Sequence, residues 1–264
     1  MALRREPPYL VGKLLGVACI ALVLLIWWFV TRGPVEERII TKGALPSPGE
    51  VFGSLTGEEG LLARGLVRSI ASTLQRVFIG FGLGILVGGL TGILAGAWRP
   101  LHAFMAPLVL FGRSLPLAAL IPLTIAWFGI DDTQKFMFIF IATVPFIFSD
   151  TAAAVMAIHE RYVETARTLG ASRWQVISKV LIPLALPKVY ISIRFLFGLG
   201  LGYIMLAEVI NANAGLGYLI NVSERRAMFE HIYLLLIVVG LLAYVIDRLL
   251  AFFQRGLFPY MKQS

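Results

Sequence analysis

Residues 77–98 read VFIGFGLGILVGGLTGILAGAW, a run of 22 residues without a charged side chain. At about 1.5 Å per residue, a helix of this length crosses the hydrocarbon core of a bilayer, which is about 30 Å thick. Glycines recur in it at every fourth position: Gly80, Gly84, Gly88, Gly92 and Gly96. Absent side chains let a second helix approach closely, and the pattern predicts packing within the chain rather than between subunits.

The composition of the whole chain agrees with a membrane protein. Of its 264 residues, 58% are hydrophobic and 14% are charged, whereas soluble domains have about 45–50% and about 25%. Cys19 is the only cysteine, which excludes a disulfide scaffold. The net charge of +8 comes from basic residues that flank apolar runs, so we expect membrane lipids and no nucleic acid as partners.

Apolar runs separated by polar segments predict six membrane spans and an all-α membrane protein. The expected organisation is a cytoplasmic N-terminus (1–13), a first transmembrane helix (14–31), a periplasmic segment (32–68), a core transmembrane domain (69–258) containing a cytoplasmic loop (159–179), and a cytoplasmic tail (259–264). The core spans are expected at 77–98, 101–130, 136–158, 180–207 and 232–253. We expect the second of these five to follow a short turn at Arg99 and Pro100, and a helix starting at residue 61 to lead into the first.

The orientation follows from the distribution of basic residues. Eleven lysines and arginines lie near span ends on the side that holds both termini, and eight lie on the other side. The positive-inside rule therefore predicts that both termini, the loop 159–179 and the tail are cytoplasmic. The third span is expected to be broken at residues 113–116, which read RSLP, and again at Pro122.

The loop 159–179 carries the most specific motif in the chain. Residues 164–174 read ETARTLGASRW, and VLIP follows at 180–183. This segment resembles the EAA loop of ABC importer permeases, with Glu164, Ala166, Gly170 and Pro183 in register. Its departures from that pattern are conservative: Thr165, Val180 and Ile182.

Further blocks extend the resemblance over most of the chain. They read LPSPGEV at 45–51, LQRVFIG at 74–80, PLAALIPL at 116–123, WFGI at 127–130 and GLGYLI at 215–220. Together they look like the nitrate, sulfonate, taurine and bicarbonate branch of these permeases. The resemblance implies the type I ABC importer permease fold, a multi-pass location in the inner (plasma) membrane of a bacterium, and uptake of a small anion.

The loop itself predicts a short amphipathic helix over 161–169 that ends at Gly170 in a left-handed turn. We expect Tyr162, Ala166 and Leu169 on one side, with the charged side chains Glu160, Glu164 and Arg167 on the other. The resemblance implies that the loop docks on an ATPase, through Glu164, Ala166, Arg167, Leu169, Gly170, Ala171 and Pro183. A helix that binds only lipid headgroups is the alternative, which the mixed charges disfavour.

No chemistry of hydrolysis is expected in this chain. The phosphate-binding pattern G-x-x-x-x-G-K-[ST] is absent, and His102, His159 and His231 lie on separate segments without metal-ligand spacing. We therefore expect no cofactor here, with ATP and Mg²⁺ held by a partner ATPase. The resemblance implies a second copy of the chain, two ABC ATPase subunits, and a periplasmic or lipid-anchored solute-binding protein as partners.

Charged residues in or near the expected spans are candidates for the translocation pathway, because a charge in the bilayer must face protein or water. The candidate set is Arg113, Ser114, Pro116, Asp150, Arg194 and Glu208. A guanidinium beside a helix break suits a small anion. In the structural alternative, Arg113 or Arg194 pairs with Asp150, or Arg76 and Arg194 extend to the membrane surface.

A secondary transporter driven by an ion gradient is the second functional hypothesis. Such transporters often contain inverted repeats, and no convincing repeat relates residues 1–132 to 133–264.

Overall fold

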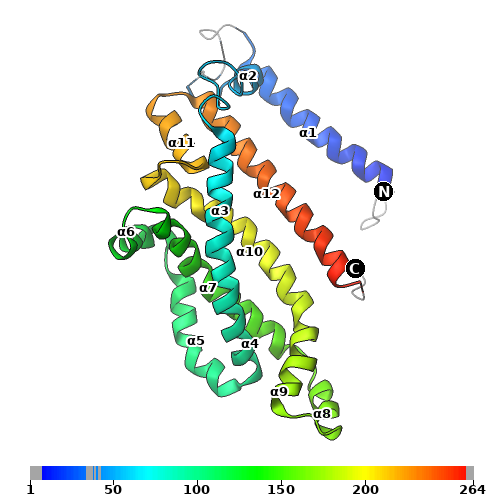
Figure 1. The fold of residues 1–264 in the computed structure, drawn as a ribbon. Helices are drawn as coiled ribbons and strands as arrows, with labels where there is room; N and C mark the ends of the chain where they lie inside the picture. The colour runs from blue at the N-terminus through cyan, green and yellow to red at the C-terminus, as the bar shows by residue number, and fades with distance from the viewer. Residues whose placement is uncertain (1–7, 34–37, 39, 41–42, 260–264) are drawn as a thin grey trace. The chain divides into compact units, whose positions relative to one another are not determined.

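The computed structural model describes residues 8–33, 38, 40 and 43–259, and these residues form helices and turns without a strand (Figure 1). Their contacts divide the chain into two compact units. One comprises Met1–Leu66 and Val222–Ile237, and the other comprises Val67–Asn221 and Val238–Ser264.

The smaller unit contains α1 (Tyr9–Thr31) and α2 (Pro48–Gly53). The indole Nε1 of Trp27 donates a hydrogen bond to the Pro46 carbonyl (2.9 Å), which attaches the end of α1 to the segment before α2. Ser47 and Glu50 form a capping box at the start of α2. The first helix starts at Tyr9, five residues before the predicted start at residue 14. The helix predicted to start at residue 61 does not, because residues 61–65 are turns, with Gly65 at φ +80°.

The larger unit is built around α7 (Asp132–Met156). The preceding span is continuous from Leu66 to Ala97, and consists of α3 (Leu66–Gly84), the π-helix η1 (Ile85–Gly89) and α4 (Leu90–Ala97).

The glycine-lined face of this span lies directly against α7. A Cβ atom on Gly92 would lie 2.8 Å from the Phe148 carbonyl oxygen, and one on Gly96 would lie 2.6 Å from the Val155 Cβ. The other three glycines of the series meet α7 in the same way. The predicted close packing within the chain is therefore confirmed, and it is backbone to backbone.

The next span is sharply bent. Helices α5 (Arg99–Ser114) and α6 (Leu117–Phe128) meet at 102°. Pro116 favours extended backbone at the residue before it, and Leu115 has ψ 131°. The predicted break is thus present at 115–116.

Two details of that span differ from expectation. The turn before α5 is Trp98 rather than Arg99 and Pro100. Pro122 does not interrupt α6, which is continuous from Leu117 to Phe128. Beyond the proline, Gln134 of α7 donates a hydrogen bond to the buried Thr124 hydroxyl (2.9 Å).

The remaining helices follow in the order α8 (Glu160–Thr168), α9 (Arg173–Val176), η2 (Ile177–Leu181), α10 (Ile182–Asn211), α11 (Leu216–Arg225) and α12 (Phe229–Leu257). The helix of the expected fifth span starts at Arg173 and not at residue 180, since Ser172 and Gln175 form a capping box there. The segment between the expected spans 180–207 and 232–253 is largely helical.

The count of spans agrees with the six predicted from the sequence. Across the described ranges, five helices are long and apolar enough to cross a membrane, and the bent pair of α5 and α6 makes a sixth when taken as one span.

Candidate functional site

Helix α8 stands between two spans and is fixed at its C-terminal end. Gly170 has φ +84°; its N–H donates to the Arg167 carbonyl (2.9 Å), and the Ala171 N–H donates to the Ala166 carbonyl (3.0 Å). This pair of bonds defines a Schellman motif, which needs a left-handed residue where glycine is favoured. The left-handed turn predicted at Gly170 is confirmed, although the helix runs from Glu160 to Thr168.

The connection from α8 to the next span is equally short. Ser172 accepts a hydrogen bond from the Gln175 N–H (3.3 Å), and the Gln175 side chain accepts one from the Ser172 N–H (2.8 Å). Pro183 then lies two residues beyond η2. It has no N–H to give to the preceding turn, which fits the change from the wide π-turn to α-helix there.

The inner side of α8 rests on the ends of the neighbouring spans. Val163, Ala166 and Ala171 pack against a buried cluster that includes Val155 and Ile177. This corrects the predicted faces, because Ala166 lies inside whereas Leu169 is 84% exposed and Tyr162 is 43% exposed. Tyr162, Ala166 and Leu169 have the spacing of one helix face, but that spacing does not show which of them contacts the buried cluster.

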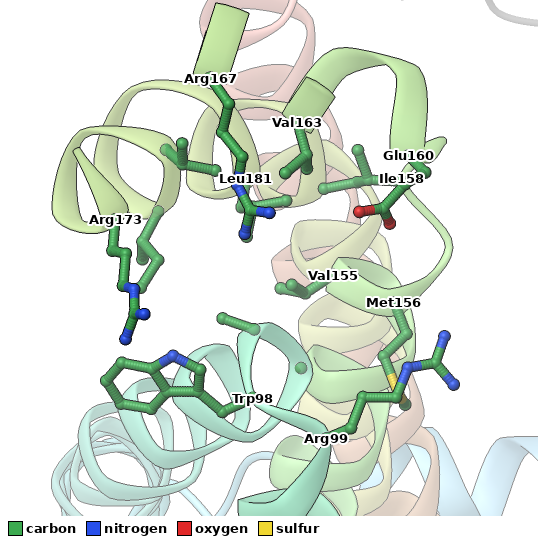
Figure 2. Close-up of a pocket in the computed structure, with 14 residues that line it drawn as sticks. Trp98, Arg99, Val155, Met156, Ile158, Glu160, Val163, Arg167, Arg173 and Leu181 are labelled. Atoms are coloured by element: carbon green, nitrogen blue, oxygen red, sulfur yellow. The ribbon is translucent and has the colours of Figure 1, made fainter. Parts of the chain in front are cut away.

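A cavity of about 340 Å³ lies between α8 and the ends of the spans (Figure 2). Arg167 extends from α8 into it, Arg173 follows the opposite wall toward Trp98, and Arg99 lies at its edge beside Met156. Glu160 turns its carboxylate toward the same space. Part of the charged side of α8 therefore faces the protein.

The buried charges of the larger unit form one network. Arg76 donates to Glu208 (Nη1 to Oε1, 2.6 Å) and to Asp132 (Nη2 to Oδ1, 2.7 Å). Glu208 is fully buried and also accepts from the Thr73 hydroxyl (2.9 Å) and the Gly217 N–H (3.0 Å). Arg76 therefore does not extend to the membrane surface, and Glu208 belongs to α10 rather than to an outer loop.

Arg194 forms a second pair, with Asp247 of α12 (2.7 Å). The alternative in which Arg194 or Arg113 pairs with Asp150 is wrong, since Arg113 donates instead to the Ser149 hydroxyl (2.9 Å). Asp247 was missed as a partner, although a carboxylate inside an apolar run is itself a signal of a paired charge.

Arg113 lies on the exposed side of α5, next to the helix break. Its guanidinium is 5.2 Å from the centre of the Phe146 ring. Together with His102 and Ser149 it lines an open cavity of about 240 Å³. Ser114 and Pro116, also predicted for the pathway, are exposed beside it, while Asp150 is partly buried on α7.

No group of three or more histidine, cysteine, aspartate or glutamate side chains suited to a metal occurs in the part of the chain that the structure describes. The guanidinium group of Arg113, beside the helix break, is of a kind that can bind an anion.

Comparison with known proteins identifies the class of this protein. Residues 80–263 match the family model described as "Binding-protein-dependent transport system inner membrane component". The chain belongs to this family. It is a permease subunit of an ABC importer and a multi-pass protein of the bacterial inner membrane.

Individual relatives agree with the branch expected from the sequence. The taurine transport system permease protein TauC of Escherichia coli (strain K12) is 28% identical over 249 residues, covering 93% of this chain and 89% of the relative. The bicarbonate transport system permease protein CmpB of Synechococcus elongatus is 29% identical over 260 residues, covering 95% and 91%.

A solved structure shares the fold. A chain of the inward-facing MetNI methionine ABC transporter superposes with a TM-score of 0.65 at 23% identity, covering 74% of this chain and 97% of the other. The predicted type I importer permease fold is confirmed.

Proposed function

We propose that this permease carries a small anion of the nitrate, sulfonate, taurine or bicarbonate type, and that a separate ATPase drives it by docking on α8. The substrate class rests on the names of the relatives, which transport taurine and bicarbonate, and on Arg113. The docking rests on the outer face of α8, which is the observation that carries the proposal.

That outer face has the features of a docking surface. Tyr162 and Leu169 are exposed on one side of α8, and Glu164 is exposed on another side, so a carboxylate and two apolar side chains are available to a partner. The Schellman motif at Gly170 and the capping box at Ser172 leave few free backbone torsions between α8 and α9. A force on α8 therefore moves the ends of α7 and α10 and is not absorbed by a flexible linker.

The residues predicted to couple to the ATPase differ in position. Glu164 and Leu169 would touch the ATPase, whereas Ala166 and Ala171 seat α8 on the spans, Gly170 and Pro183 shape the backbone, and Arg167 faces the cavity. ATP and Mg²⁺ would be held by the ATPase, and this chain would be a non-catalytic subunit. Two copies of the chain, two ATPase subunits and a periplasmic or lipid-anchored solute-binding protein would complete the importer.

For the pathway we propose the exposed side of the helix break. Arg113 is the anion-binding side chain, with Ser114 and Pro116 beside it on the chain, and the place of Asp150 in the pathway stays a prediction. Arg194 and Glu208 are already held by ion pairs within the chain, and their place in the pathway stays a prediction.

The orientation is testable with cysteine labelling, because Cys19 is the only native cysteine. In a Cys19→Ser background, a cysteine at Leu169 should react with a membrane-impermeant maleimide in inside-out vesicles and not in intact spheroplasts. Labelling in spheroplasts instead would place α8 on the outer side and refute the cytoplasmic assignment.

The docking is tested by co-purification with the ATPase of the same transport system in lipid discs. Leu169→Ser should lower the amount of bound ATPase at least tenfold, since losing one buried leucine contact is worth about 1.5–3 kcal/mol. Leu10→Ser, which changes a 73% exposed leucine on α1, is the matched control. Equal loss in both variants would refute docking through α8.

The rigidity of α8 is tested with Gly170→Ala. An alanine at φ +84° is strained by about 1 kcal/mol, so ATP hydrolysis stimulated by the binding protein should fall. Gly198→Ala is the control, because nothing lies within 4 Å of its added Cβ. Uptake under an ion gradient alone, without ATP, would favour the secondary transporter instead.

A further inference from the structure

We propose that the cavity beneath α8 binds the phosphate headgroup of an anionic phospholipid, on the side of α8 opposite to the docking face. This inference goes beyond the proposed function, and it rests on the charge, the position and the walls of the cavity.

The charge of the cavity favours a phosphate. Arg99, Arg167 and Arg173 line it together with Glu160, which gives a net formal charge of +3 − 1 = +2. None of the three guanidinium groups forms an ion pair or side-chain hydrogen bond with a residue in the described ranges. They are therefore free to donate to an incoming oxyanion, for which arginine has matching geometry.

The position of the cavity corresponds to the headgroup layer. One span ends at Ala97, another ends at Met156, and a third begins at Arg173, so three span ends meet around it. Trp98 and Trp174 pack edge to face there, with ring centroids 6.3 Å apart. Tryptophan is enriched where membrane meets water, and basic pockets at that level bind acidic headgroups.

The walls favour a lipid over free phosphate. Behind the arginines lie Val155, Ile158 and Leu181, which suit the glycerol backbone and the first carbons of an acyl chain. The volume, about 340 Å³, is within the range of small-ligand sites. A bound headgroup would join α8, through Arg167, to α9, through Arg173.

The experiment uses the full chain purified without an ATPase, so that its failure leaves the proposed function standing. Native mass spectrometry measures how many phosphatidylglycerol or phosphatidylcholine molecules remain bound. A tryptophan-fluorescence titration compares dihexanoyl-phosphatidylglycerol with inorganic phosphate. The variants are a pocket triple (Arg99→Gln, Arg167→Gln, Arg173→Gln), the same three positions changed to lysine, and a charge-matched control triple (Arg161→Gln, Arg248→Gln, Arg255→Gln).

We expect tight retention of phosphatidylglycerol by the wild type, the lysine triple and the control triple. Each arginine removed should weaken binding about fivefold, and the glutamine triple about a hundredfold. The lysine triple also separates loss of charge from misfolding. The proposal would be overturned if the glutamine triple and the control triple retained phosphatidylglycerol equally well. It would also be overturned if the wild type retained phosphatidylcholine as well as phosphatidylglycerol. Equal affinity for inorganic phosphate would show a free-anion site and overturn the lipid assignment.

Discussion

The pair of Arg76 and Glu208 allows a sharp test of how the larger unit is held together. Replacing Glu208 by alanine removes the acceptor of the Thr73 hydroxyl, the Gly217 N–H and one Arg76 nitrogen. It also leaves Arg76, which is 5% exposed, without its buried counter-charge. Removing one partner of a buried ion pair destabilises a protein by about 3–5 kcal/mol. We expect the free energy of unfolding to fall by an amount in that range.

Asp132 provides a matched control because it contacts the same arginine. Its side chain is 69% exposed, while that of Glu208 is fully buried. An exposed ion pair contributes about 0–1 kcal/mol, so Asp132→Ala should destabilise the chain by about 1 kcal/mol or less. The two variants remove the same kind of charge from the same partner and differ mainly in burial.

The assay is equilibrium unfolding in mixed micelles with increasing dodecyl sulfate, followed by tryptophan fluorescence. A double variant, Arg76→Met with Glu208→Leu, should be more stable than Glu208→Ala alone, because no charge is then left buried. The reasoning is refuted if Glu208→Ala and Asp132→Ala lower the unfolding free energy equally.

Two further predictions concern packing and pH. Gly92→Val should destabilise the larger unit by about 3 kcal/mol, since α4 must move away from α7; Gly82→Val, where nothing lies within 4 Å, should have little effect in the same assay. Partial burial alone raises the pKa of Glu50, but hydrogen bonds from Arg38 and Ser47 outweigh it and lower the pKa to about 2. A lowered folded-state pKa stabilises above the ordinary value of 4.5, and the contribution is lost as pH falls toward 2. Hydrogen-exchange protection of α2 should therefore fall between pH 7 and pH 3, and less so in Arg38→Gln; unchanged protection would contradict the assignment.

Much of the fold could be predicted because apolar runs and glycine spacing act locally. The glycine series from Gly80 to Gly96 indicates that another helix packs closely against this one. The dipeptide Leu115–Pro116 indicates where a span bends. The boundaries were less accurate. The start at Arg173 depends on the capping box of Ser172 with Gln175, whereas hydropathy alone favours the apolar run from residue 180.

Pairing of charges could not be predicted in the same way, because it depends on which faces of distant helices meet. Arg194 and Asp150 are both intramembrane charges in the sequence, but the structure pairs Arg194 with Asp247. The grouping of Ala166 with Tyr162 and Leu169 on one side of α8 was wrong for the same reason. The motif identified the loop, and only the packing of Val163 and Ala166 shows which side of it is free.

The glycine contact between the span Leu66–Ala97 and α7 limits how the protein can move during transport. Side chains that interdigitate can change rotamer and let two helices slide, whereas here backbone atoms of α7 lie against four of the five glycines. Sliding by a fraction of a turn would drive the ridges of α7 into the helix it faces. We therefore expect these two helices to move as one rigid unit, with any change of conformation during transport occurring in the elements around them.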